Sequence, residues 1–214
     1  KNLLLLDNNQ SSIDKCIKKI DSINSKVNIV SSIIDFNDRN DLKTKLEAID
    51  IFLSSVPYKH NLMLTDIALE TSCSMVDLGG HTGNVIKQLD KDKEAREKKI
   101  TIVPDCGMGP GMNVSMALLA IEQFGEAYDV RIWDGGLPRN PKEPWNYSLF
   151  FNIVGLTNEY DAHAFFLKEG EVVEVDCFEG YEIIDFGESI GKLEASVTSG
   201  GLSTMPWSFK PSQR

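Results

Sequence analysis

Two short segments of this 214-residue chain combine residue types that could do chemistry. The first, VDLGGH at 76–81, places Asp77 before two glycines and His81. Glycines let a flat ring approach the backbone closely, an acid beside that ring can orient an amine or relay a proton, and histidine titrates near neutral pH. The alternatives without a catalytic role are a helix N-cap for Asp77 and a surface position for His81.

The second segment, PDCGMGPGM at 104–112, places Asp105 and Cys106 at an expected strand end and Met112 before an expected helix. A helix N-terminus carries partial positive charge and free N–H groups, so this one could hold a substrate carboxylate. The alternative is a hinge between domains. We expect Cys106 to be a packed thiol, because no base is evident beside it.

GMGPG at 107–111 also invites interpretation as a phosphate-binding turn, because it follows a strand and opens a helix. Three features argue against this. The spacing is G-x-G-x-G rather than G-x-G-x-x-G, Pro110 lies inside the turn, and the segment that follows looks antiparallel. We therefore interpret the turn as the hinge and floor of a cleft.

Polar residues farther along the chain are candidates for substrate contacts. Arg131 could clamp a carboxylate by bidentate pairing, and a surface ion pair is the alternative. The segments LTNEY and TSGGLST offer further polar groups, namely Asn158, Ser199, Gly200 and Thr204. Aromatic residues expected to pack in the core or at a subunit interface are Trp133, Trp145 and Trp207.

The elements that would position these residues follow two patterns. The first half alternates between strands expected at 2–7, 27–31, 49–55, 74–78 and 100–104 and helices expected at 11–23, 39–47, 61–70 and 82–98. This alternation predicts an α/β fold with an incomplete Rossmann-type, doubly wound parallel sheet over residues 1–108. A helix at 113–124 then precedes the strand-like runs VRIWDG, YSLFFNIV, HAFFLKEG, EVVEVDCF and YEIIDF. They predict an α+β domain over 109–214 with a mainly antiparallel sheet backed by that helix.

Asp7 ends the first expected strand, where an acid in a dinucleotide-binding fold accepts hydrogen bonds from the adenosine ribose. The following residues, NNQ, offer no cation for a 2′-phosphate, which favours NAD over NADP. The alternative is that Asp7 only caps the helix that follows it. The pattern of that helix itself indicates Ser11 or Ser12 as its cap. Because no G-x-G-x-x-G precedes Asp7, we expect an N-terminally truncated fragment that binds NAD poorly by itself.

Six segments carry a resemblance to a known family: SVPYKH at 55–60, VDLGG at 76–80, TIVPDCGMGPGM at 101–112, GGLP at 135–138, NYSLFFNIVGLTNEY at 146–160 and TSGGLSTMP at 198–206. From about Asp50 onward, the chain resembles the saccharopine dehydrogenase superfamily, most closely its lysine 6-dehydrogenase branch. The resemblance implies a nicotinamide pocket lined by Ser55, Val56, Pro57, Leu78 and Gly79. It implies catalytic candidates at Tyr58, His60, Asp77 and His81.

The activity implied by this resemblance is NAD-dependent oxidation of an amino acid at a carbon–nitrogen bond. L-lysine would be oxidised at its ε-carbon to allysine, with release of ammonia. Saccharopine is the alternative substrate, but its extra carboxylates should require more arginines than Arg131 and Arg139, which alone precede the terminal Arg214 in the second domain. A non-catalytic NAD-binding relative is the alternative from another class. The resemblance also implies a homodimer, formed through the second domain.

Composition excludes other classes of function. A net charge of −10 argues against nucleic-acid and anionic-membrane surfaces, which require clustered Lys and Arg. No apolar run is long enough to span a bilayer. The four cysteines show no CxxC spacing, so we expect no metal site and no disulfide framework. Because free thiols persist in a reducing compartment, we expect the protein to be cytoplasmic.

Overall fold

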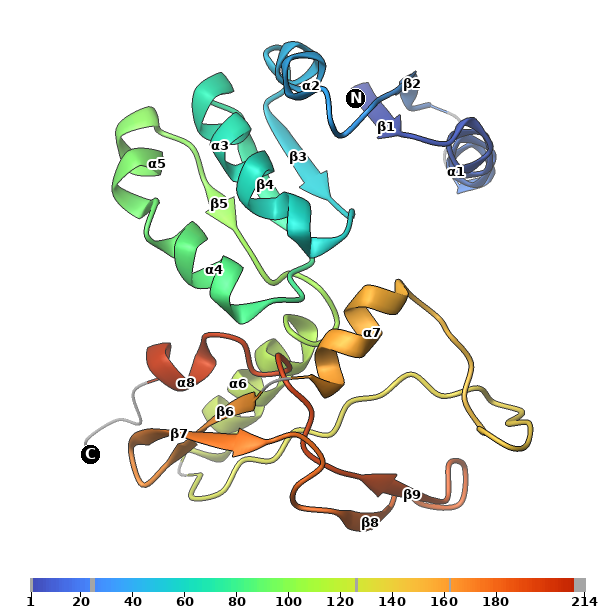
Figure 1. Cartoon of the computed structure of the whole chain (residues 1–214), viewed down its shortest axis with the longest axis vertical. Coiled ribbons are helices and arrows are strands. Elements are labelled where there is room, and N and C mark those ends of the chain that lie inside the picture. The colour runs from blue at the N-terminus through green and yellow to red at the C-terminus, as the bar shows by residue number, and fades with distance from the viewer. Residues whose placement is uncertain (1, 24–25, 126, 162, 210–214) are drawn as a thin grey trace.

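The computed structural model describes residues 2–23, 26–125, 127–161 and 163–209, and it shows an upper and a lower half (Figure 1). The upper half runs β1 (Asn2–Asp7), α1 (Gln10–Ile23), β2 (Asn28–Ile33), α2 (Arg39–Leu46), β3 (Ile51–Ser54), the 3-10 helix η1 (Tyr58–His60), α3 (Asn61–Thr71), β4 (Ser74–Asp77), α4 (Thr82–Leu89), α5 (Asp92–Lys98) and β5 (Ile102–Val103). The lower half runs α6 (Met112–Phe124), α7 (Ile153–Tyr160), β6 (His163–Lys168), β7 (Glu171–Asp176), β8 (Glu182–Asp185), β9 (Lys192–Ala195) and α8 (Met205–Ser208).

The strands of the upper half are parallel, as the sequence predicts, but they form two sheets. β1 pairs with β2 in the register Asn2 to Asn28 through Asp7 to Ile33. β4 lies between β3 and β5 in the second sheet. Figure 1 shows β1 and β2 to the right of β3. Within the described residues no strand pairing joins the β1–β2 sheet to the β3–β4–β5 sheet.

The apolar core of the upper half lies between α2, α3 and β4. Its buried members are Ile34, Leu42, Leu46, Leu64, Ile67, Ala68 and Met75. Each fully buried aliphatic side chain of this size contributes about 1.5–3 kcal/mol. Phe52 of β3 and Ile102 of β5 pack against this cluster, and the carboxyl ends of β3, β4 and β5 point toward the lower half (Figure 1).

The lower half has little core of its own. Apart from Pro110 and Pro206, the single buried apolar side chain in the described part of residues 109–209 is Ala164. β6 and β7 form one antiparallel hairpin and β8 and β9 form another, which confirms the expected antiparallel pairing. The helix that packs on β6 is α8, whereas α6, the helix expected to back the sheet, buries none of its residues.

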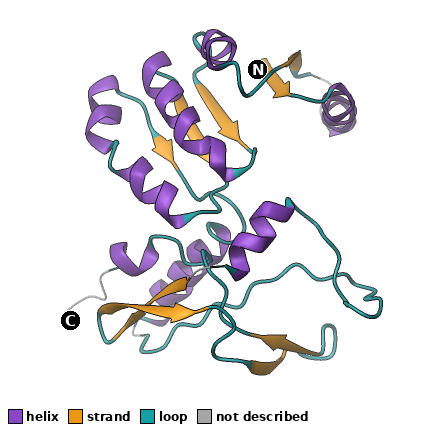
Figure 2. Ribbon diagram, viewed as in Figure 1, coloured by secondary structure: helices purple, strands orange, loops and turns teal. Residues whose placement is uncertain are grey.

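Several expected elements differ from the structure. The helix expected over 82–98 is two helices, α4 and α5, separated at Asp90 and Lys91. The strands expected at VRIWDG and YSLFFNIV are absent, and Figure 2 shows a long loop between α6 and α7 in their place. An apolar run becomes a strand only where a neighbouring edge completes its hydrogen bonds, and the described chain supplies no such edge to Val130 or Trp133. The sequence also did not predict β9 or α8.

Candidate active site

The candidate site lies where loops after β3, β4 and β5 meet the lower half. The carboxyl ends of parallel strands share one edge of a sheet, which is where ligands bind in open α/β folds. Two hydrogen bonds join side chains of the lower half to these loops of the upper half. The Asn158 side-chain amide donates to the Gly80 carbonyl at 2.9 Å. The Ser203 hydroxyl donates to the Asp105 carboxylate.

Asp77 is the buried centre of the upper side, with no exposed surface. Its Oδ1 accepts from the Gly79 N–H at 2.7 Å, and its Oδ2 accepts from the Gln88 amide at 2.7 Å. Its main-chain carbonyl accepts from the Cys106 N–H at 2.8 Å. Asp77 therefore ties the loop after β4 to the loop after β5. It does not cap α4.

Gln88 extends this connection into the upper core. Its amide also donates to the Thr65 hydroxyl at 3.0 Å, and that hydroxyl donates to the Asn61 carbonyl at 2.8 Å. Gln88, Thr65 and Asn61 are all buried. Sequence reasoning missed Gln88, although one signal was present. It follows buried Val85 by three residues, which places a polar residue on the inward face of α4.

Tyr58 and His81 stack at the mouth of the junction, with ring centroids 5.3 Å apart and planes inclined by 22°. Asn84 fixes both residues. Its side-chain amide donates to the Tyr58 carbonyl at 3.1 Å, and its N–H donates to His81 Nδ1 at 3.1 Å. His81 is thus the N-cap of α4, and a neutral ring in this role carries its proton on Nε2.

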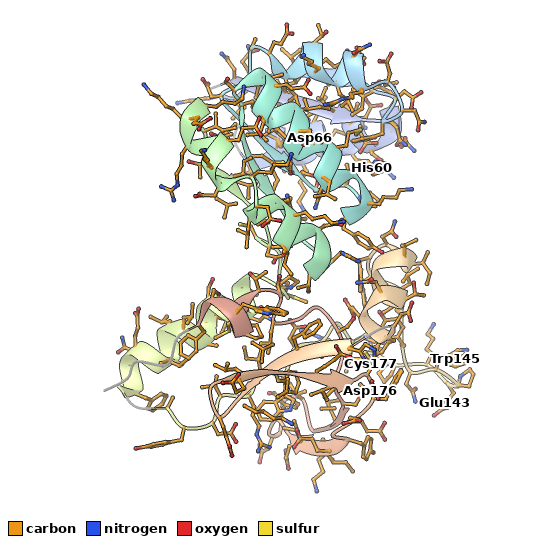
Figure 3. The ribbon with its side chains drawn as sticks, turned by 60° about the vertical axis from the view of Figure 1, so that its left-hand side comes forward. His60, Asp66, Glu143, Trp145, Asp176 and Cys177 are labelled. Atoms are coloured by element: carbon orange, nitrogen blue, oxygen red, sulfur yellow. The ribbon has the colours of Figure 1, made fainter. Side chains whose placement is uncertain are left out.

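His60 lies apart from this pair. Its ring centroid is 5.1 Å from that of Phe36, in the upper half (Figure 3). Burial and the nearby charge of Lys59 lower the pKa of His60. The structure therefore brings together Tyr58 and His81, two of the catalytic candidates, and leaves His60 against the upper core.

Asp105 occupies the middle of the junction in a left-handed backbone conformation with φ of 60°. Its Oδ2 accepts from Ser203, while its Oδ1 is buried and has no hydrogen-bond partner among the described residues. Burial raises the pKa of Asp105 to about 6. The Ser203 hydrogen bond opposes this shift, and the charge of Asp77 adds to it. Gly79 allows the close packing, since a Cβ there would lie 2.0 Å from Asp105 Oδ1.

Cys106 is exposed rather than packed. Its Sγ lies 3.7 Å from the Val103 carbonyl oxygen and 3.8 Å from that of Pro104. Burial raises the pKa of its thiol, and the carboxylates of Asp77 and Asp105 raise it further. The thiol is therefore protonated near neutral pH.

The glycines of GMGPG let the backbone of this loop fold onto its neighbours. A Cβ on Gly107 would lie 2.6 Å from the Leu78 carbonyl oxygen, and one on Gly111 would lie 2.4 Å from the Gly107 carbonyl oxygen. These positions need glycine because protein backbone occupies the space. The loop connects β5 to α6.

The first amides of α6 are already hydrogen-bonded. The N–H of Met112 donates to Gly107, that of Asn113 donates to Met108, and that of Val114 donates to Asn113 Oδ1 at 2.7 Å. These three donors are therefore used within the loop, and the carboxylate site expected at this helix N-terminus finds no free donor among them. Met112 itself is 54% exposed.

A second acidic group lies beside the hinge. The Asn113 side-chain amide contacts Asp134 Oδ2 at 3.3 Å and donates to the Gly201 carbonyl at 3.1 Å. Burial raises the pKa of Asp134, and burial together with the charge of Asp134 raises the pKa of Glu159. The sequence did not single out Asn113 or Asp134, which come from segments 21 residues apart.

The TSGGLST candidates bond to different partners, and of the three only Gly200 bonds to Ser203. The Ser199 hydroxyl donates to the Asn158 carbonyl at 2.5 Å, and the Gly200 carbonyl accepts from the Ser203 N–H at 2.9 Å. Thr204 precedes α8, and its carbonyl accepts from the N–H groups of that helix. Ser203 is 7% exposed and makes the contact with Asp105, although the sequence had singled out only its neighbours.

Arg131 lies outside the junction and forms an exposed ion pair with Asp129 at 2.9 Å, as in the alternative given above. It lines a groove of about 650 Å³ between α6 and residues 127–135, together with Met112, Met116 and Trp133. None of the three tryptophans is buried, and Trp145 is 84% exposed. Arg214 lies outside the described residues.

The residues expected to bind the cofactor lie after β1, β3 and β4. Asp7 Oδ1, at the end of β1, accepts from the Asn9 N–H at 2.8 Å. The cap of α1 is Asn9, whose Oδ1 accepts from the Ser11 N–H at 2.9 Å, rather than Asp7, Ser11 or Ser12. Ser55, Val56 and Pro57 form the turn after β3, and Leu78 is 44% exposed beside it. The sequence contains no G-x-G-x-x-G for the pyrophosphate.

The described residues contain no group of three or more His, Cys, Asp or Glu side chains arranged to hold a metal ion. In the same residues, every helix is too short or too polar to cross a bilayer. The four cysteines are free thiols.

No family model matches the sequence. The structure is similar to apo saccharopine dehydrogenase (L-Glu forming) from Saccharomyces cerevisiae, with a TM-score of 0.56 and 17% sequence identity. The match covers 86% of this chain and 46% of the yeast chain, so the chain spans about half the length of that protein. At this identity, what the two proteins share is the fold.

Proposed function

We propose that this protein is an NAD-dependent oxidoreductase that acts on the CH–NH2 group of an amino acid. The observation that supports this most is the junction itself. It places Asp105, the Tyr58–His81 pair and Ser203 at the carboxyl edge of a parallel sheet, in a fold shared with a saccharopine dehydrogenase.

The proposed reaction requires one contribution from the cofactor and others from the protein. NAD, when bound, accepts a hydride from the carbon that bears the nitrogen. The protein must keep the amine neutral, hold the amino-acid end and align the reacting carbon. Tyr58 and His81 supply flat surfaces at the mouth, and Asn158 and Ser199 supply polar groups from the lower half.

L-lysine is the substrate that we propose, oxidised at its ε-carbon to allysine with release of ammonia, as in the lysine 6-dehydrogenase branch. The charges around the junction support a cationic substrate. Asp105, Asp134 and Glu159 are acids, whereas Arg131 is paired with Asp129 at the surface. Saccharopine, with additional carboxylates, suits these charges less well.

The test is steady-state kinetics of the full-length protein with NAD and a panel of amino acids, followed by the absorbance of the reduced cofactor. We expect turnover with lysine and much slower turnover with saccharopine. Faster turnover of saccharopine would reassign the substrate, and no reduction with either would overturn both enzyme assignments.

A non-catalytic NAD-binding relative is the second candidate. The glycine turn of the full-length protein distinguishes this candidate from the enzyme, since an intact G-x-G-x-x-G supports an enzyme and a degraded one supports the non-catalytic relative. Isothermal titration of the full-length protein with NAD separates the two. Binding without turnover of any amine supports the second candidate, and binding with turnover excludes it.

We further propose a cytoplasmic homodimer that associates through the second domain. The exposed apolar residues of the lower half support this, since Phe124 is 81% exposed and Trp145, labelled in Figure 3, is 84% exposed. Two-stranded sheets such as β6–β7 and β8–β9 also gain stability when their edges are covered. With a net charge of −10 we expect no nucleic-acid or membrane partner. Light scattering should give twice the chain mass, and a monomeric mass would contradict the proposal.

A further inference from the structure

We propose that Asp105 is the proton-accepting residue of this site, positioned by Asp77 from the upper half and completed by Ser203 from the lower half. The inference rests on the proposed oxidation of an amine and adds the residue that makes the amine reactive. Three properties of Asp105 support it: the contacts that fix its backbone, the groups around its carboxylate, and its partial exposure.

The backbone of Asp105 is fixed by β4. The Asp105 N–H points to Asp77 Oδ1 at 3.4 Å, and the next N–H, that of Cys106, donates to the Asp77 carbonyl at 2.8 Å. Gly79 packs directly against the Asp105 carboxylate. The Asp77 side chain is in turn held by Gln88. Asp77 and Gln88 are therefore positioning residues that act through Asp105.

The surroundings of the Asp105 carboxylate make it a base near neutral pH. The titratable groups that face it are Asp77 and the Cys106 thiol, and Ser203 supplies a neutral donor from the lower half. Among the described residues no Lys, Arg or His pairs with it, and its Oδ1 has no partner. Burial raises the pKa of Asp105 to about 6, so at pH 7 the group is ionised and still accepts a proton readily.

The other acid–base candidates at the junction are less suited to this role. Asp77 has no exposed surface. His81 uses Nδ1 as an acceptor for the Asn84 N–H, and its remaining nitrogen is the one that carries the proton. His60 packs against Phe36. Asp105 is partly exposed as a residue, and its Oδ1, although itself buried, has no hydrogen-bond partner among the described residues.

The proposed step is a proton transfer from a substrate ammonium group to Asp105. One N–H bond breaks, an O–H bond forms on the carboxylate, and the freed lone pair of the nitrogen can form the C=N bond when hydride leaves the carbon. The iminium group then takes up water and releases ammonium, which leaves an aldehyde. Asp105 returns its proton to solvent, so the net reaction consumes one amine, one NAD⁺ and one water.

The first test is Asp105→Asn. Asparagine adopts the left-handed conformation as readily as aspartate and can still accept from Ser203, but it cannot accept a proton. We expect kcat to fall by roughly 100-fold or more, the usual contribution of a positioned base, with a smaller change in KM and loss of the acidic limb of the pH profile. The matched control is Asp90→Asn at an exposed helix end, which should stay within about twofold of the parent on both constants, the scatter expected of a surface position.

Ser203→Ala tests the contribution of the lower half. Loss of the hydroxyl removes a hydrogen bond that favours the charged form, so the acidic limb of the pH profile should move to higher pH. Ser208→Ala, at an exposed serine of α8 that bonds only to its own helix, is the control and should leave the profile in place.

A readout independent of turnover is the carbon-13 carboxyl NMR titration of the full-length protein without substrate. The signal that disappears in Asp105→Asn should titrate near pH 6 in the parent and at higher pH in Ser203→Ala. Titration in the ordinary aspartate range would overturn the inference. So would full activity in Asp105→Asn, and in that case the proposed function would stand. If no amine is oxidised by the parent protein, both the function and the role of Asp105 fail.

Discussion

Replacing Gln88 by leucine removes a buried side-chain amide that joins the upper core to the candidate site. Leucine keeps most of the volume of Gln88 and its place on the inward face of α4. What is lost is the pair of hydrogen bonds to Asp77 at 2.7 Å and to Thr65 at 3.0 Å. The substitution therefore tests whether this polar connection stabilises the fold.

The expected effect is a loss of about 2–3 kcal/mol in the free energy of unfolding. Leaving a buried acceptor without its donor costs about 1–3 kcal/mol, and more when the acceptor is charged, as Asp77 is. One term opposes this loss. Gln88 Oε1 is buried and has no partner among the described residues, so its removal relieves about 1 kcal/mol.

Urea and thermal unfolding, followed by circular dichroism, measure the effect. For a protein of this length, 2–3 kcal/mol corresponds to a decrease in Tm of roughly 4–12 °C. The matched control is Gln10→Leu, because the Gln10 amide donates to the Asp14 carboxylate at 2.8 Å on the surface. Its effect should stay within about 0.5 kcal/mol. Equal losses in the two variants would refute the reasoning, since they would show that burial of the Gln88 contact adds nothing.

Three further predictions concern the same region and the core. Gly79→Ala should lower the free energy of unfolding by about 1–3 kcal/mol, because the added Cβ would lie 2.0 Å from Asp105 Oδ1 and the backbone φ is 73°. Gly170→Ala, at φ of 85° with open space around it, should lower it by only about 1 kcal/mol. Urea unfolding measures both, and similar losses would contradict the packing argument. Because the folded pKa of Asp105, about 6, lies above its ordinary 3.8, the folded state binds the extra proton between these values and the parent protein loses stability as pH rises through that window. Urea midpoints of Asp105→Asn relative to the parent should therefore increase from about pH 4 to pH 7 and then level off, and a difference that does not vary with pH would count against this assignment. Burial, with a smaller contribution from Asp50, raises the pKa of Cys73 to about 11, so a disulfide reagent at neutral pH should modify Cys73 only after unfolding, and rapid loss of this thiol in the native protein would show that the site is open.

Local pattern was sufficient for much of the fold. The helices α1, α2 and α3 and the strands β1 to β4 lie within a few residues of their expected ranges, because apolar spacing and turn residues encode such elements directly. The hairpin β6–β7 follows from alternation in the same way. The sequence also placed Asp105 at a strand end and Asp77 before a tight turn.

Local pattern failed where an element depends on a distant partner. VRIWDG has the composition of a strand, but the described chain offers it no neighbouring edge, and it remains a loop. The parallel strands of the upper half separate into two sheets for the same reason. Trp145 resembles a core residue in sequence and is exposed, because the lower half has too few packed layers to cover it.

The sequence by itself determined which chemical groups are available: acids, glycines, an aromatic–histidine pair and a cluster of serines near strand ends. Only the tertiary structure decided which of them meet. It buried Asp77 beside Gln88, placed His60 against Phe36 and Tyr58 against His81, and brought Ser203 onto Asp105 from 98 residues away. The physical reason is that hydrogen bonding and charge depend on surroundings supplied by other segments, whereas periodicity in the sequence records only which face of its own element a residue occupies.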